Sequence, residues 1–167
     1  MVKQTKIIYV RKSLSLCYAL NKMNSLKEKP DFSKIAASDI HKFKHCDIFR
    51  RKDGILQAHF YSEYTGEIED AINIVETFKI LKTEQKCLAL LTVEDGASFT
   101  KEAREFVASA EVSNMVIADA FVINSLALKI LMNGYLKFNK PNRPTKFFNS
   151  AETAIAWLKE FNLSTRQ

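Results

Sequence analysis

From residue 46 onward, short continuous apolar runs alternate with longer segments in which apolar residues recur every three or four positions. Short runs of this kind are typical of strands that are covered on both faces, and the three-four spacing is typical of helices that pack on a sheet. The runs CLALLTV, VSNMVIA and PTKFF predict strands at residues 87–93, 112–118 and 144–148. The spaced segments predict helices at residues 67–82, 101–110, 122–138 and 149–161.

The stretch CDIFRRKDGILQAHF, residues 46–60, predicts a β-hairpin. Its two apolar segments flank Lys52-Asp53-Gly54, and Asp-Gly is a strong signal for a tight turn. The element order from there is β-β-α-β-α-β-α-β-α, and strands that alternate with helices imply parallel pairing with right-handed crossovers. We therefore predict an α/β domain over residues 46–167, in which a mixed sheet with an antiparallel start packs with about four helices.

Residues 1–45 precede this domain and are predicted to form a basic N-terminal extension. Residues 1–52 carry thirteen Lys and Arg against four Asp and Glu, and residues 53–167 carry twelve against fifteen, so the net charge of +6 is the sum of +9 and −3. A basic arm can hold nucleic acid or an anionic membrane surface, but charges this dispersed favour a solvated extension. Its pattern suggests an edge strand at IIYVR and short helices at residues 14–23 and 33–43.

The longest apolar stretch, Met115 to Leu136, approaches the length of a membrane span. Asp119, Asn124 and Lys129 interrupt it, and charges inside a span are costly. A buried strand followed by a buried helix explains the stretch better, so we predict no membrane span.

The side chains that catalysis needs are scarce in this chain. Its three cysteines, Cys17, Cys46 and Cys87, show no paired spacing, which argues against zinc and disulfide chemistry and favours a reducing, cytoplasmic location. Glu94 and Asp95 are adjacent in a strand, so they point to opposite faces and do not form an acid–base pair. Because the chain has four glycines and no phosphate-binding loop, we predict no enzyme activity, no cofactor and no metal site.

The turn VEDGASFTKEAREF, residues 93–106, is the main candidate site because ligands of α/β sheets bind beyond the carboxyl ends of strands. Thr100 is predicted to cap the helix that follows, as Thr65 and either Asn149 or Ser150 cap two others. The simplest interpretation of the turn is this cap with a solvated helix face. The alternative is an interaction site formed by its polar side chains: Asp95, Ser98, Thr100, Glu102, Arg104 and Glu105.

The element order and three stretches, EAREF, NGYLKFNKPNRPTKFF and NSAETAIAWLKEF, resemble an uncharacterised bacterial family with the fold of the anti-sigma-factor antagonist (STAS) domains. The resemblance covers residues 46–161 and leaves the N-terminal extension unexplained. Its most specific features are Asn133, the Asn139-Lys140-Pro141 stop, Pro144, and Ala154 to Leu158. It implies a STAS-like fold and a regulatory role through binding of a protein partner.

The resemblance also implies a test of the turn. In classical anti-sigma antagonists the turn resembles D-x-S-G-V-x-F-x-D-S-S-G, and phosphorylation of a serine at the helix start controls binding to a kinase partner. Aligned on Gly96 and Phe99, D-S-S-G falls on residues 101–104, and the phosphoacceptor position holds Ala103. Alanine has no hydroxyl, so this chain is predicted to lack the phosphoserine switch.

Three functions of different classes follow from these observations. The first is a non-catalytic STAS-like regulatory domain that binds an unknown protein partner, with self-association as a homodimer left open. The second is a carrier of an apolar or anionic small ligand in a groove between helices and sheet, for which an ordered apolar cavity would be the sign. The third is nucleic-acid binding through the basic arm, for which a steep loss of affinity with salt would be the sign.

Overall fold

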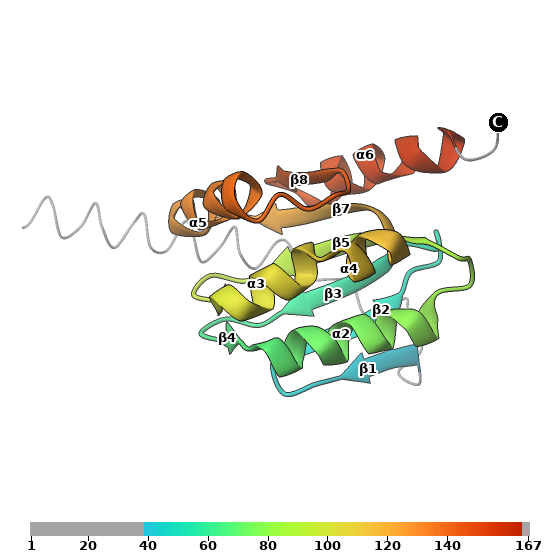
Figure 1. Cartoon of the computed structure of the whole chain (residues 1–167). Coiled ribbons are helices and arrows are strands. Elements are labelled where there is room, and N and C mark those ends of the chain that lie inside the picture. The colour runs from blue at the N-terminus through green and yellow to red at the C-terminus, as the bar shows by residue number, and fades with distance from the viewer. Residues whose placement is uncertain (1–38, 165–167) are drawn as a thin grey trace, which may run out of the picture.

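A six-stranded sheet lies at the centre of the computed structural model, which describes residues 39–164 (Figure 1). The neighbouring strands are, in spatial order, β1 (Ile40–Lys42), β2 (Cys46–Arg50), β3 (Leu56–Phe60), β5 (Cys87–Val93), β7 (Val116–Ile123) and β8 (Thr145–Phe148). The β1–β2 and β2–β3 pairs are antiparallel, and the three later pairs are parallel. The predicted α/β class, with an antiparallel start followed by parallel strands, is confirmed.

The predicted hairpin at residues 46–60 is also confirmed. Arg51 N–H donates to the Ile55 carbonyl at 2.9 Å, and Gly54 N–H donates to the Arg51 carbonyl at 3.0 Å. Gly54 has a φ of +83°, a conformation that glycine adopts without steric cost. The Asp53 carboxylate accepts from Ile55 N–H and pairs with Arg51 at 3.1 Å, so the turn is held by side chains as well as by its backbone.

Four helices cover one face of the sheet, which we call the four-helix face (Figure 1). They are α2 (Ile68–Leu81), α3 (Lys101–Ala108), α4 (Ala110–Met115) and α5 (Leu126–Phe138). The strand order never reverses between β3 and β8, so right-handed crossovers place every connecting helix on the same side. Ala89 and Leu91 of β5 point to this face and pack with these helices.

The opposite face is covered over β5, β7 and β8 by α6 (Ala151–Ser164), and we call it the α6 face. Leu88 and Leu90 of β5 point to it, since neighbouring residues of a strand alternate between faces. They pack against Ala154 and Leu158, both fully buried. Ser150 caps this helix by accepting from Thr153 N–H at 3.4 Å, which confirms one of the two predicted caps.

Two predicted boundaries on the four-helix face are wrong. Residues 112–115, predicted as strand, belong to α4, because Val112 and Met115 are spaced by one helical turn and both pack into the core. The helix predicted from residue 122 begins at Leu126, because Val122 and Ile123 still pair with β5.

The predicted Thr65 cap is wrong as well. Thr65 lies in a two-residue strand, β4 (Thr65–Gly66), that pairs in parallel with β6 (Ser98–Phe99). The N-cap of α2 is Glu67, whose backbone N–H donates to the Asp70 carboxylate at 2.9 Å in a capping box. Polar residues precede α2 at several positions, and the short β4–β6 pairing decides which of them can serve as the cap.

The N-terminal extension lies mostly outside residues 39–164. Within that range, Ile40–Lys42 form the edge strand β1, which pairs with β2, and not the end of the helix predicted at residues 33–43. The sheet therefore begins ahead of residue 46. The other predictions for the extension fall on residues that the structure does not describe. They concern its edge strand, its first helix and the absence of zinc and disulfide chemistry at Cys17.

The long apolar stretch is divided between the strand β7 and the helix α5, as predicted. Among the helices of residues 39–164, none has both the length and the apolar character required to cross a bilayer.

Candidate functional site

The predicted site, the turn between β5 and α3, is held by the short β4–β6 pairing. Ser98 N–H donates to the Tyr64 carbonyl at 2.6 Å, and Thr100 N–H donates to the Gly66 carbonyl at 2.9 Å. Gly96 has a φ of +85°, and a Cβ there would lie 2.7 Å from a carboxylate oxygen of Glu63. A side chain at this position would strain the backbone, and it would also displace the Glu63 carboxylate.

The structure divides the predicted site residues into two groups. Ser98, Thr100 and Arg104 face the turn itself, where the Ser98 hydroxyl lies 2.9 Å from that of Thr65. Glu102 and Glu105 lie on the exposed side of α3, and Glu105 pairs with Lys101 at 3.6 Å. Asp95 is half-buried on the β5 side of the turn, beside Glu94. The polar side chains of this turn therefore do not converge on one point.

Thr100 is the cap of α3, as predicted, and its hydroxyl accepts from Ala103 N–H at 3.3 Å. Arg104 turns back over the turn, and its guanidinium donates to the Phe99 carbonyl. Arg104 is half-buried and also lines a cavity between the helices and the sheet. This residue therefore connects the predicted turn with the interior of the four-helix face.

A polar row that the sequence did not predict crosses β3 and β5. The His59 Nδ1 atom lies 2.9 Å from the Thr92 hydroxyl, and His59 Nε2 lies 3.3 Å from a carboxylate oxygen of Glu94. The Gln57 amide donates to the same Thr92 hydroxyl at 3.3 Å. The hollow beside this row has a volume of about 10 Å³, room for about one water molecule. We interpret the row as a network that satisfies buried polar groups of the sheet.

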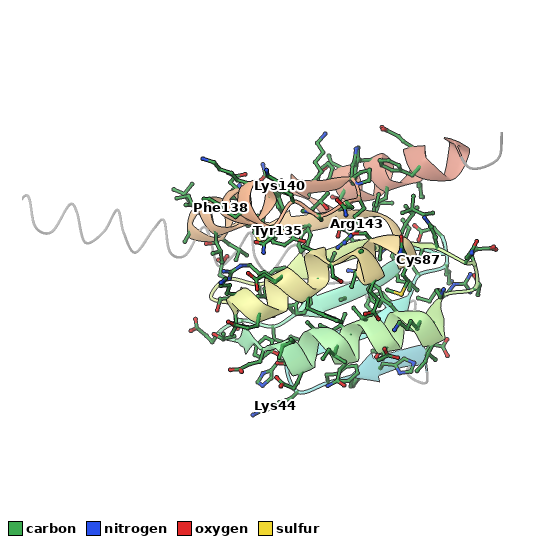
Figure 2. The ribbon with its side chains drawn as sticks, in the orientation of Figure 1. Lys44, Cys87, Tyr135, Phe138, Lys140 and Arg143 are labelled. Carbon is green, nitrogen blue, oxygen red and sulfur yellow. The ribbon has the colours of Figure 1, made fainter. Side chains whose placement is uncertain are left out.

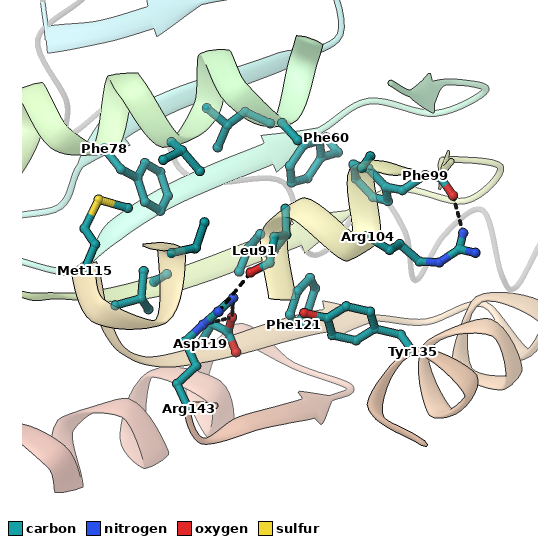
Figure 3. Close-up of a pocket in the computed structure, with 18 of the residues that line it drawn as sticks. Phe60, Phe78, Leu91, Phe99, Arg104, Met115, Asp119, Phe121, Tyr135 and Arg143 are labelled. Atoms are coloured by element: carbon teal, nitrogen blue, oxygen red, sulfur yellow. Dashed lines mark hydrogen bonds and ion pairs between the residues drawn. The ribbon is translucent and has the colours of Figure 1, made fainter. Parts of the chain in front are cut away.

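A cavity on the four-helix face has a volume of about 70 Å³. Side chains from α2, α3, α4 and α5 form its roof, and side chains from β3, β5 and β7 form its floor (Figure 3). Most of the lining is apolar, including Phe60, Phe78, Leu91 and Phe121. An ordered apolar cavity of this kind is what the small-ligand alternative requires.

A buried ion pair stands at one end of this cavity. Arg143 Nε and Nη2 lie 2.7 and 2.5 Å from Asp119 Oδ2, and both side chains are at most 3% exposed. Arg143 Nη1 also donates to the Val107 carbonyl at 2.9 Å and to the Ser113 hydroxyl at 3.2 Å. Burial raises the pKa of Asp119, and the charge of Arg143 opposes that shift. The pair joins β7 to the segment before β8 and to the end of α3.

Two buried polar atoms beside this pair, Asp119 Oδ1 and the Tyr135 hydroxyl, make no hydrogen bond of ordinary length among the described residues. The Thr145 hydroxyl lies near Asp119, and the Arg143 guanidinium lies near Tyr135. Tyr135 extends from α5 into the cavity lining and is 3% exposed (Figure 3). Burial, together with the charge of Asp119, raises the pKa of Tyr135 to about 12, so its hydroxyl keeps its proton at neutral pH. Both atoms have almost no accessible surface, so the void itself is bounded almost entirely by apolar atoms.

Sequence reasoning missed this end of the cavity. It treated Asp119 only as an interruption of an apolar run. A lone carboxylate in a strand that is buried on both faces requires a cationic partner. Arg143, between Pro141 and Pro144, was the basic residue that could have been matched with it.

Helix α5 carries a row of exposed apolar side chains, which we call the α5 stripe: Leu126, Ile130 and Phe138. They are 73%, 66% and 79% exposed. Their spacing places Leu126 and Ile130 on the side of α5 that faces away from Tyr135, whereas Phe138 lies one turn after Tyr135. Figure 2 shows Phe138 projecting from the outer end of the helix. Exposed apolar side chains that gather on one helix, rather than scatter singly, are typical of an interaction surface.

Comparison with known proteins gives a family for this chain. No curated protein and no solved structure matches it. Residues 49–162 match a family described as a domain of unknown function, DUF7793, and this range includes both the cavity and the α5 stripe. Since the match spans more than half of the sequence, the chain belongs to this family of uncharacterised domains.

Proposed function

We propose that this chain is a non-catalytic regulatory domain of STAS-like fold that binds a partner protein through the α5 stripe. The observation that carries the proposal is the exposure of Leu126, Ile130 and Phe138 on a single helix. Leaving three large apolar side chains in water adds nothing to the stability of the fold, whereas burying each one in an interface contributes about 1.5–3 kcal/mol.

The shape of the stripe suits a side chain from a partner. Gly134 lies in the same row, between Ile130 and Phe138, and a Cβ placed there would meet no atom closer than Phe138 Cδ2 at 4.0 Å. The row therefore has a gap with a ridge on either side. An apolar side chain of a partner helix fits such a gap in the manner of a knob in a hole.

The charges around the stripe select the chemistry of the partner. From Ala120 to Ala151 the sequence has no Asp or Glu, and the charged residues are Lys129, Lys137, Lys140, Arg143 and Lys146. Two copies that met through α5 would bring like charges together, which is unfavourable. We therefore propose a different protein as the occupant, with an amphipathic segment whose apolar ridge is flanked by Asp and Glu.

The absence of a phosphoserine switch is part of the proposal. Ala103 is 1% exposed and lies in the first turn of α3. A hydroxyl at this position would be buried and out of reach of a kinase without unwinding of the helix. Regulation by this domain is therefore proposed to depend on binding alone.

A displayed library of amphipathic helical peptides, selected on the full chain, tests the proposal. Positions on the apolar and on the flanking sides of the peptides are both randomised. We expect enrichment of Leu and Phe on one side and of Asp and Glu beside it. Affinity of the enriched peptides should fall at least about tenfold on Ile130→Gln, since about 1.4 kcal/mol corresponds to a factor of ten.

The matched control is Ile80→Gln on α2, because Ile80 is 74% exposed but lies away from the stripe. It should leave peptide affinity unchanged. Enriched peptides with Lys flanks, or equal binding to the two variants, would contradict the proposal. If light scattering shows a homodimer that Ile130→Gln dissociates, the occupant of the stripe would be a second copy of this chain and not a different protein. Binding to anionic vesicles without any peptide selection would assign the stripe to a membrane surface.

A further inference from the structure

We propose that a cleft at the amino ends of β5 and β7 binds an organic diphosphate, a small molecule that carries two linked phosphate groups. The cleft lies between the β2–β3 turn and residues 82–86, the loop that connects α2 to β5. Because no residue of α5 lines this cleft, the proposal goes beyond partner binding by the α5 stripe and does not depend on it. It also places the anionic ligand of the small-ligand alternative in a different part of the fold.

The cleft has the size of a small-molecule site. Its volume is about 790 Å³, within the range of about 300–1,000 Å³ that is usual for ligand pockets, whereas the apolar cavity of the four-helix face has about 70 Å³. Cys87 and Leu88, which are buried, and Ile117, which is half-buried, give the cleft an apolar base. The organic part of a ligand can therefore rest on this base while its charged part faces the rim.

The rim of the cleft carries cations that have no carboxylate partner among residues 39–164: Arg50, Lys82 and Lys86. Arg50 Nη2 donates to the Thr83 hydroxyl at 3.1 Å and lies 3.9 Å from the place of a Cβ on Gly54, so its guanidinium connects the loop with the turn. Lys82 Nζ donates to the Gln85 carbonyl at 2.8 Å. Neutral acceptors thus hold these two cations in place without cancelling their charge, and each cation keeps further donors for a ligand.

The two carboxylates that line the cleft, Asp53 and Glu84, do not neutralise it. Asp53 is already paired with Arg51 at 3.1 Å and with Lys159 at 3.6 Å. When these partners are included, five cations stand against two carboxylates, a net charge of +3. Positive charge that lines a concave, low-dielectric surface attracts anions more strongly than the same charge on an open surface.

This charge favours a diphosphate over other anions. A phosphate monoester carries about −1.5 to −2 at neutral pH, so two linked phosphate groups come close to balancing the cleft. A single carboxylate supplies one negative charge and leaves most of the cations unmatched. The guanidinium of Arg50 can bind two phosphate oxygens with parallel N–H donors, and the lysines act as point charges beside it.

The test is isothermal titration calorimetry on the full chain with ADP, geranyl diphosphate and AMP as probes. We expect both diphosphates to bind, and AMP to bind at least about tenfold more weakly than ADP because it lacks the second phosphate group. Binding should weaken as salt is added, since salt screens the rim charges. Tighter binding of ADP would identify an aromatic organic part, and tighter binding of geranyl diphosphate an aliphatic one.

Variants assign the binding to the cleft. Arg50→Gln should weaken the affinity for the tighter diphosphate about tenfold, the effect of losing a hydrogen bond to a charged group. Lys86→Gln should act in the same direction, and Glu84→Gln should strengthen binding because it removes a negative charge. Lys101→Gln is the matched control: it removes the same charge as Lys86→Gln, but Lys101 is 72% exposed on α3, outside the cleft. It should leave the affinity unchanged, as should Ile130→Gln, which separates this site from the partner surface.

Arg50 is exposed, so a thermal melt of Arg50→Gln should coincide with that of the wild type and show that lost binding does not reflect unfolding. Four results would each overturn the proposal: no binding of either diphosphate at millimolar concentration, equal binding of AMP and ADP, equal binding by wild type and Arg50→Gln, or a loss on Lys101→Gln as large as that on Arg50→Gln. A single-stranded oligonucleotide that displaces the diphosphate at lower concentration would also overturn it and assign these cations to a nucleic-acid surface.

Discussion

The two faces of the sheet are built in different ways, although both are closed by helices. Beneath α6 the α6 face is sealed by apolar packing, with Leu158 and Ala154 fully buried and Trp157 against Phe148 and Phe161 at ring distances of 5.5 and 4.9 Å. The polar row of Gln57, His59 and Thr92 lies on the same side of the sheet. The four-helix face encloses an ion pair, two unsatisfied polar atoms and a cavity. A buried ion pair is costly to desolvate, and its place beside a cavity makes the four-helix face the first place to look for function.

The largest expected effect is the loss of the ion pair. Arg143→Met leaves the Asp119 carboxylate buried without a partner, and breaking a buried pair from one side costs about 3–5 kcal/mol. Urea unfolding measures this change. The double variant Asp119→Leu/Arg143→Met should recover part of the stability, because it removes both charges. A loss below about 1 kcal/mol on Arg143→Met would mean that the pair is not buried as described.

Packing on the two faces gives the next contrast. Leu158→Ala on the α6 face should cost about 4 kcal/mol, and Met132→Ala beside the cavity about 2 kcal/mol, within the range for deletions of buried side chains. Met132 already borders empty space and so makes fewer contacts to lose. The same unfolding experiment compares them. Equal costs would argue that the cavity closes in solution.

Alkaline pH should affect the four-helix face through Cys87, which is buried there. Burial raises the pKa of its thiol from 9.0 to about 11. Because the folded state holds this proton more tightly, its contribution is complete below pH 9.0 and is lost as the pH rises to about 11. Two pKa units correspond to roughly 2–3 kcal/mol.

The measurement is urea unfolding between pH 8 and pH 11 for wild type and Cys87→Ala. The slope of stability against pH should be flatter for the variant. Cys46 and Tyr135, whose pKa values burial raises to about 12, contribute to the remaining slope in both proteins, as do Tyr61 and Tyr64, whose pKa values burial also raises. Parallel slopes in the two proteins would show that the thiol stays accessible to solvent.

The helix cap at the turn gives a smaller effect. Thr100→Ala should cost about 1 kcal/mol, because the Ala103 N–H loses its acceptor at the start of α3. Ser98→Ala is the matched control, since the Ser98 hydroxyl contacts only Thr65 in the exposed β4–β6 pair. In thermal unfolding, Thr100→Ala should lower the stability more than Ser98→Ala. The reverse order would show that Thr100 is not the cap that stabilises α3.

The smallest expected change in stability is that of Ile130→Gln. The side chain is 66% exposed, and surface substitutions of this kind stay within about 0.5 kcal/mol. A thermal melt that coincides with wild type would confirm that the α5 stripe is not needed for folding. A clear drop in melting temperature would mean that the stripe contributes to the stability of the fold, and it would weaken the case for a partner.

The sequence predicted the regular part of this structure well, because periodicity and turn chemistry are local. The Asp53-Gly54 turn, the strand CLALLTV and the Thr100 cap are found as predicted. The predictions are wrong where the local structure depends on a contact between residues that are distant in the sequence. The β4–β6 pairing moves the cap of α2 from Thr65 to Glu67, and core packing turns residues 112–115 into a helix.

The same limit explains the candidate site. The polar residues of the turn could be named from the sequence. In the structure, however, the turn mainly caps α3 and forms the β4–β6 pairing. The polar end of the cavity joins Asp119 of β7, Tyr135 of α5 and Arg143 of the following loop. Those residues become neighbours only after β7 and α5 pack together, and no local sequence pattern predicts that contact.

The strand order of this sheet has a consequence for synthesis on the ribosome. From β1 to β8, each strand is added beside the one made just before it. A nascent chain can therefore extend the sheet one strand at a time, but each parallel pair must wait for the helical segment between its two strands. Helix α6 is the last described element to emerge. Until it docks, Leu88, Leu90 and Ala120 remain uncovered, and this brief interval is when the growing chain is most open to chaperones and to aggregation.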